Sequence, residues 1–139
     1  MAKHCLSLTY EPKIPAVRNG SCTQTIRPLG SVEKHVGDWV MFHGWSDKPY
    51  RSPWSWRTSY WELEYTASVK FYPGQMFEVF TVTEPVAYPK EKMDEIARRD
   101  WFSDYEVMFQ QFRLMYKKKL ESMIFQILRW DPKKAMDVV

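Results

Sequence analysis

The stretch WELEYTASVKF, at Trp61–Phe71, says more about the fold than any other part of the sequence. Apolar residues at the odd-numbered positions alternate with polar residues at the even-numbered ones. Because successive side chains of a β-strand point to opposite faces of the sheet, this alternation predicts a long, half-buried strand. Pro73 and Gly74 follow, and they favour a tight turn. We therefore expect a hairpin whose second strand is Met76–Val82.

The rest of the N-terminal half predicts further strands. We place them at residues 1–10, 21–27 and 39–45, where β-branched and aromatic residues are bounded by turn residues. Between the first two, Glu11–Gly20 contains two prolines and ends in Asn19-Gly20, which predicts a short helix or loop closed by a turn.

The region after Pro89 has helical character. Lys90–Asp100 is polar and helix-forming, and Ser103 with Glu106 predicts a capping box at the start of a second helix. Aromatic residues then recur at three- and four-residue steps and indicate one buried helix face, formed by Phe102, Tyr105, Phe109, Phe112 and Tyr116. We interpret Lys117–Lys119 as the solvated end of this helix. A final strand at 122–130 completes an α+β protein.

The composition is that of one globular domain spanning residues 1–139. Hydrophobic residues make up 45% of the chain and charged residues 27%. The aromatic share of 17% exceeds what a small core needs, so we expect some rings at the surface. Twenty basic against 17 acidic residues favour a nucleic-acid partner only weakly.

The sequence offers little for metal, disulfide or membrane chemistry. Cys5 and Cys22 are too few for a disulfide framework, and neither they nor the three histidines have metal-ligand spacing. We therefore expect no metal and no cofactor. The first ten residues lack the apolar segment of a signal peptide, and no run reaches membrane-spanning length, so we expect a soluble, cytoplasmic protein.

The stretch WSDKPYRSPWSWR, at Trp45–Arg57, is the most distinctive candidate for binding. It interleaves cations with aromatic rings, a composition that suits unpaired bases because rings stack on bases while cations attract the phosphates. We expect a functional loop that covers a cleft. Its candidate nucleic-acid-binding residues are Lys48, Tyr50, Arg51, Trp54, Trp56 and Arg57.

Three segments, taken together and in order, resemble the ASCH family of the PUA-like superfamily. They are LSLTYEPKIPAVRNGSCTQTIR, HVGDWVMF, and RRDWFSDYEVMFQQF with the closing IFQILRW. The resemblance spans nearly the whole chain. It implies a mixed β-barrel flanked by helices, with a cleft beside the second strand that binds RNA or nucleotides. Some short members resemble amidohydrolases that act on N4-acetylcytidine, and one branch is associated with RNA cleavage.

The resemblance also assigns residues. It implies Thr25 as a nucleophile, Arg27 as a neighbouring cation and Asp100 as the carboxylate of the site. The position of the family's lysine is occupied by Cys22, and a neutral thiol is a poor base for activating a threonine hydroxyl. Simpler interpretations remain: Thr25 as a strand former, Arg27 as a surface charge, and Asp100 as an aid to the following helix cap.

The leading hypothesis is a module that binds RNA, single-stranded nucleic acid or a modified nucleoside. Its cleft beside the second strand would include Thr25, Arg27 and Asp100. One alternative is a small hydrolase, either an amidohydrolase or a ribonuclease, with Thr25 and Asp100 as catalytic residues. Another is a protein-interaction domain coupled to transcription, which predicts a large exposed apolar patch.

Overall fold

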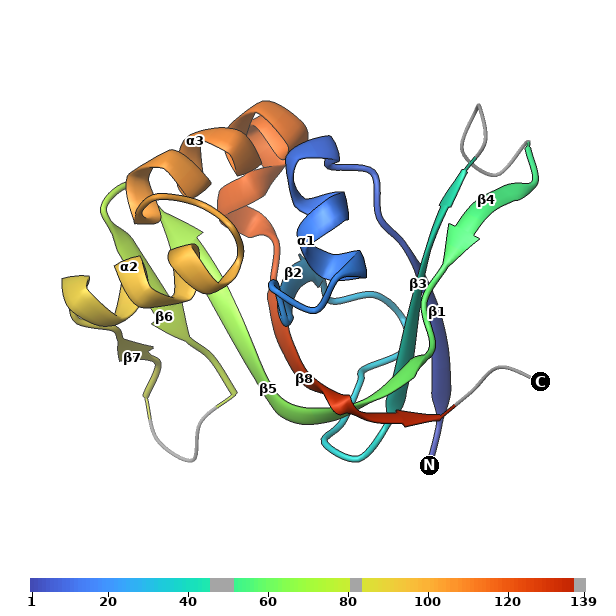
Figure 1. Cartoon of the computed structure of the whole chain (residues 1–139). Helices are drawn as coiled ribbons and strands as arrows, with labels where there is room; N and C mark the ends of the chain where they lie inside the picture. The colour runs from blue at the N-terminus through green and yellow to red at the C-terminus, as the bar shows by residue number, and fades with distance from the viewer. Residues whose placement is uncertain (46–51, 81–83, 137–139) are drawn as a thin grey trace. The chain divides into compact units, whose positions relative to one another are not determined.

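The computed structural model describes residues 1–45, 52–80 and 84–136 and has the predicted α+β composition (Figure 1). Within this part of the chain, eight strands form one mixed sheet. They are β1 (Lys3–Ser7), β2 (Gln24–Pro28), β3 (Trp39–Trp45), β4 (Trp54–Arg57), β5 (Tyr60–Tyr72), β6 (Gln75–Glu78), β7 (Val86–Ala87) and β8 (Phe125–Met136). The helices are α1 (Ile14–Arg18), α2 (Lys90–Arg99) and α3 (Tyr105–Tyr116), with 3-10 turns η1 (Glu11–Lys13) and η2 (Lys117–Ser122).

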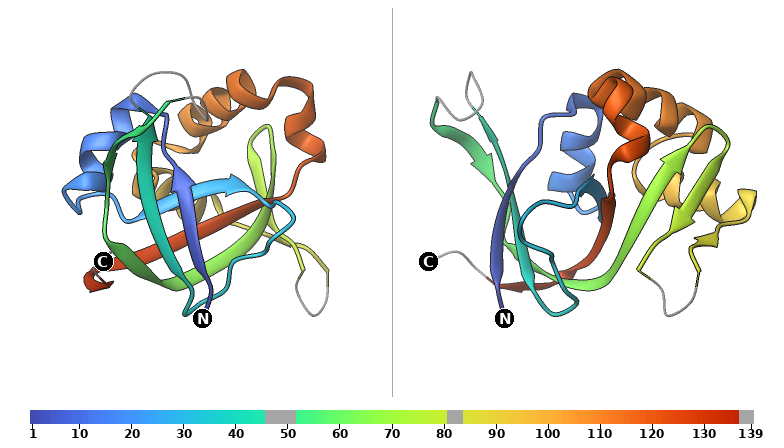
Figure 2. Two further views of the ribbon diagram at one scale, coloured as in Figure 1. Left: turned by 90° about the vertical axis from the view of Figure 1, so that its right-hand side faces the viewer. Right: turned by 180° about the vertical axis from the view of Figure 1, so that it is seen from behind.

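The sheet mixes parallel and antiparallel pairs. β1 and β3 run parallel and side by side, with Lys3 opposite Trp39 (Figure 2). β3 pairs antiparallel with β4 and β5, and β5 pairs antiparallel with β6, which also pairs with β7. β8 pairs with both β2 and β5. The α+β class is therefore confirmed, whereas the strands of the described residues do not close into the expected barrel.

The chain forms two compact units, each built from segments that are not contiguous in sequence. The first unit contains residues 1–23, 34–65 and 129–139, and the second contains 24–33 and 66–128. The expectation of one domain over 1–139 stays a prediction.

Aromatic rings form the core of the first unit. Trp61 and Trp130 stack with an interplanar angle of 2° and a centroid separation of 5.8 Å. Phe42 packs on Trp130 with its centroid 4.8 Å away. All three side chains are at most 6% exposed, so they contribute a dry aromatic cluster at the middle of the unit.

A buried carboxylate ties the N-terminus to the start of β3. Asp38 Oδ2 lies 3.0 Å from His4 Nε2 and accepts a hydrogen bond from the His35 amide, while Oδ1 accepts one from the Ala2 amide. Burial raises the pKa of Asp38, but these hydrogen bonds and the nearby His4 outweigh it and hold the pKa below its ordinary value. The carboxylate therefore stabilises the folded state in its charged form.

The second unit packs helix α3 against the β5–β6 hairpin. Phe71, Phe112 and Phe125 contact one another in its core, with Phe71 and Phe112 edge to face at 5.4 Å. The Tyr105 hydroxyl shares its single proton between the carbonyl oxygens of Tyr72, at 2.8 Å, and Gln75, at 2.6 Å. These contacts confirm the buried aromatic face predicted for this helix.

Several predicted boundaries differ from the observed ones. The strand predicted at Trp61–Phe71 is confirmed and is one residue longer at each end, and Gly74 adopts φ +69° in the expected turn. The partner strand ends at Glu78 rather than Val82. The cap of α3 was predicted at Ser103 and is Asp104, whose carboxylate accepts from the Val107 amide at 2.9 Å. An ionised carboxylate suits a helix N-terminus because it also interacts with the dipole.

Candidate nucleic-acid interface

A pocket of about 440 Å³ lies within the first unit, between helix α1 and the β3–β4 hairpin. This volume is within the usual range for small-molecule sites. Its polar lining comes from Thr9, Glu11, Arg18 and Ser55, and the ring of Trp56 is part of its wall. The remaining lining residues are Leu8, Ile14, Gly44 and Trp45.

The hairpin that forms one wall of the pocket corrects the sequence prediction. Trp54–Arg57 was expected to be part of a loop and is strand β4, with Arg57 opposite His43 and Trp56 opposite Gly44. The register then shifts so that Trp45 faces Trp54, which leaves Ser55 as an extra residue. Such a β-bulge re-aims side chains. Tryptophans have high strand propensity, so two of them at alternate positions favour pairing with β3.

One face of the hairpin carries Trp56 against Gly44. A Cβ added at Gly44 would lie 2.6 Å from Cε2 of Trp56 and 3.0 Å from Cδ1, so the ring takes the space that a side chain would occupy. The guanidinium carbon of Arg18 lies 5.1 Å from the centre of the same ring. This is a cation–π arrangement, and it places a positive charge and an aromatic face together at the pocket.

The other aromatic residues of the hairpin form a second cluster. His43 and Trp54 stack with centroids 4.0 Å apart, and Trp45 meets His43 edge to face at 4.9 Å. His43 is 4% exposed, whereas Trp54 keeps 40% of its surface exposed. Trp54 is thus a ring held in place by a buried neighbour and open to solvent. Arg57, at the end of the same strand, is also exposed.

Three other candidate binding residues belong to the Trp45–Arg57 stretch. Lys48, Tyr50 and Arg51 lie outside the described residues. The structure therefore brings Trp54, Trp56 and Arg57 onto one short strand. It adds Arg18, which sequence reasoning missed because Arg18 lies far from the Trp-rich stretch in the chain, and only the fold brings it to Trp56.

The second strand presents buried polar residues in the second unit. Gln24 donates a hydrogen bond to Asp100 Oδ1 at 3.1 Å and another to the Ile96 carbonyl at 2.9 Å. Asp100 is 2% exposed and lies at the C-terminal end of α2. Thr25 is 3% exposed. Because adjacent strand residues point to opposite faces, Thr25 leaves β2 on the face opposite to Gln24, the residue that contacts Asp100.

Arg27 and Cys22 complete the set of residues singled out by the sequence. Arg27 is half-buried on β2. Burial raises the pKa of Tyr116, and the positive charge of Arg27 opposes that increase, so these two side chains interact electrostatically. Cys22, in the first unit, is 1% exposed, so the thiol at the position of the family's lysine is buried.

Among residues 1–45, 52–80 and 84–136, no group of three or more His, Cys, Asp or Glu side chains is arranged to hold a metal ion. In the same ranges, no helix combines the length and apolar character needed to cross a membrane. Comparisons with protein-family models, curated proteins and solved structures found no match to this chain.

Proposed function

We propose that this protein binds single-stranded nucleic acid or a nucleotide, and that the pocket beside Trp56 receives a base. The observation that carries the proposal is the pairing of Arg18 with the Trp56 ring at a 440 Å³ pocket. An arginine over a tryptophan ring suits a nucleotide, because a base stacks on the guanidinium plane or takes its place on the ring, while the cation attracts the phosphate.

The second aromatic cluster supports the same function. Trp54 is 40% exposed and its orientation is fixed by stacking on His43. A ring that is already ordered loses little conformational entropy when a base stacks on it. Trp54 and Trp56 lie on opposite sides of the Ser55 bulge, and therefore offer two separate stacking surfaces on one strand.

The ASCH resemblance remains part of this proposal. The order of β1, α1 and β2 followed by a returning β8 is compatible with it, and a family of RNA- or nucleotide-binding domains fits an aromatic, basic pocket. The PUA-like architecture is proposed as an open variant, since the described strands are not closed into a barrel.

The hydrolase alternative has less support. Thr25 and Asp100 are both more than nine-tenths buried, and Asp100 already accepts a hydrogen bond from Gln24. A structural role at the end of α2 accounts for that contact. Incubation with N4-acetylcytidine and with labelled RNA tests the alternative: turnover that disappears in Thr25→Ala would favour it.

Fluorescence anisotropy with a labelled 12-nucleotide single-stranded RNA tests the binding proposal. We expect Trp54→Ala and Trp56→Ala each to weaken binding by about 5- to 150-fold, since a stacked base contributes about 1–3 kcal/mol. Trp101→Ala is the matched control, because Trp101 is 45% exposed and belongs to the second unit. Equal losses in all three variants, or no binding at low salt, would overturn the proposal.

The salt dependence of the same titration tests whether the cations of the site contact phosphates. Affinity should fall as salt increases, with a slope of about −0.7 per phosphate contact on a log–log plot. We expect Arg57→Gln to lower the magnitude of the slope by roughly one such contact. Arg98→Gln, which removes an exposed arginine from α2, should leave the slope unchanged.

A further inference from the structure

The solvent side of α3 carries exposed apolar side chains among its polar ones, which include Glu106, Gln110 and Arg113. The side opposite the buried aromatic face carries Val107, which is 47% exposed, and Leu114, which is 73% exposed. Met115, at the flank of this face, is 48% exposed. Single exposed apolar residues are common, but a group on one helix is typical of an interaction surface.

Cations gather where this apolar face ends. Lys117, Lys118 and Lys119 follow α3 directly and are exposed, and Arg113 lies one turn earlier on the helix. Lys117 begins η2 with φ +55° and ψ −130°, a backbone conformation that normally favours glycine. The chain turns sharply at this point, so the three lysines project from a bend rather than along one helix face.

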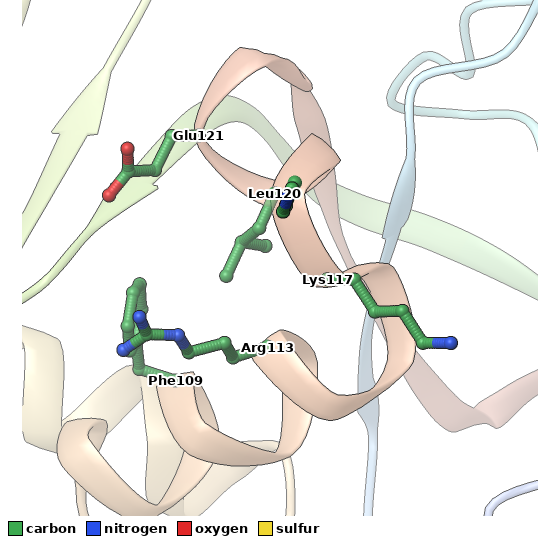
Figure 3. Close-up of a pocket in the computed structure, with 6 residues that line it drawn as sticks. Phe109, Arg113, Lys117, Leu120 and Glu121 are labelled. Atoms are coloured by element: carbon green, nitrogen blue, oxygen red, sulfur yellow. The ribbon is translucent and has the colours of Figure 1, made fainter.

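Two hollows flank the bend, and both lie in the second unit. One has a volume of about 660 Å³ and is lined by Met115, Tyr116 and Met123 together with Lys117–Lys119. The other has a volume of about 480 Å³ and is lined by Phe109, Arg113, Leu120 and Glu121. Lys117 and Lys118 line both hollows. Figure 3 shows the second hollow, with Arg113 and Lys117 pointing away from each other.

We propose that this surface, formed by Leu114, Met115, Lys117–Lys119 and Met123, binds a short acidic segment of a partner protein that carries apolar side chains. Among the described residues, four cations and one carboxylate line the two hollows, so the surface favours an anionic partner. Methionine side chains are flexible and polarisable, and they adapt to apolar side chains of different shape.

The chemistry of the lining favours a peptide over nucleic acid. A single strand of RNA is held by cations together with exposed rings. Here the apolar lining of the larger hollow consists of Met115, Met123 and Tyr116. The ring of Tyr116 is only half-exposed, because it packs on Phe112 and Phe125. Burying the leucine and methionine side chains of this surface against apolar side chains of a partner is favourable. The proposed peptide supplies such side chains, and a phosphate backbone does not.

Anisotropy titration of the full chain with a labelled synthetic peptide tests this proposal. The probe is a 14-residue peptide of Glu and Asp with leucines three and four positions apart. We expect Lys117→Glu/Lys118→Glu to weaken its binding at least tenfold, through charge repulsion. Leu114→Ser/Met115→Ser should weaken it at least fivefold without any change of charge. Arg98→Glu, a charge reversal on the exposed side of α2, is the control and should change binding less than twofold.

Two further probes separate the possible outcomes. A peptide with serine in place of each leucine should bind at least fivefold more weakly; equal binding would mean that only charge is recognised and would overturn the proposal. A 12-nucleotide RNA that displaces the peptide and loses affinity in the same lysine variants would also overturn it, in favour of a phosphate site. Absence of peptide binding at low salt is the third contradicting result.

The two proposals can fail independently. The lysine, leucine and methionine variants lie outside the Trp56 pocket, and their RNA affinity should remain that of the wild type if the pocket alone binds RNA. Circular dichroism and urea unfolding of each variant establish that it is folded. Because the substituted side chains are exposed, we expect the urea midpoint of each variant to stay close to that of the wild type.

Discussion

Replacing Gly44 by alanine perturbs the proposed pocket while leaving every tryptophan in the chain. The added Cβ would meet Nε1 of Trp56 first and would lie 2.6 Å from Cε2, whereas ordinary contacts begin at about 3.4 Å, so the ring must retreat by more than about 0.8 Å or rotate away. Overpacking of this kind costs about 1–3 kcal/mol. The ring would also leave its position beside Arg18.

A double-mutant cycle isolates this contact. In wild type, Gly44→Ala should lower the free energy of unfolding by about 1–3 kcal/mol, measured by urea denaturation. In a Trp56→Ala background, the clash is absent and alanine is favoured over glycine in a strand, so the same change should be stabilising by roughly 0.5 kcal/mol. Gly30→Ala is the control, since no atom lies within 4 Å of its added Cβ.

The sign reversal is the decisive measurement. If Gly44→Ala costs the same with and without the Trp56 ring, the argument that the ring takes the place of a side chain at Gly44 is wrong. The RNA titration gives an independent measurement: Gly44→Ala should weaken binding in the same direction as Trp56→Ala, and the double variant should bind no more weakly than Trp56→Ala alone.

Three shorter predictions concern stability. Because folding lowers its pKa, Asp38 should contribute stability that is present above about pH 4 and is lost as the pH falls through the folded pKa. In Asp38→Asn, the dependence of unfolding on pH below about pH 4 should therefore be weaker than in the wild type. Tyr105→Phe should lower the free energy of unfolding in urea by about 1–2 kcal/mol, because the carbonyl oxygens of Tyr72 and Gln75 lose their donor. Lys117→Gly should change unfolding by about 0–2 kcal/mol in the stabilising direction, because glycine relieves the positive φ, and a loss of stability would contradict the strain.

The parts of the fold that the sequence predicted are those with a local physical cause. Strand β5 follows from strict alternation over Trp61–Phe71, and α3 follows from aromatic residues spaced to cover one face. The cap moved from Ser103 to Asp104 because both residues are good caps and only the path of the chain selects between them. Boundaries of this kind depend on tertiary contacts that a local pattern does not contain.

The candidate site was harder to predict because it depends on pairs distant in sequence. Trp54 and Trp56 were identified by composition, but their strand was taken for a loop because two nearby prolines and the charged residues suggested one. Arg18 acquires its role only when α1 lies beside the hairpin. Asp100 was expected as the carboxylate of a site or as an aid to the following helix cap, and its buried contact with Gln24 could not be foreseen without the pairing of distant segments.

The aromatic cluster of the first unit also bears on how the chain is made. Phe42 and Trp61 are synthesised well before Trp130, which stacks on Trp61 and packs at a tilt against Phe42 in the native state. Until that last strand emerges, the first unit lacks one of its core rings, and two large apolar side chains await their partner. Chains stopped before residue 130 should therefore aggregate or be degraded rather than yield a working fragment. Completion of this unit therefore requires the synthesis of strand β8.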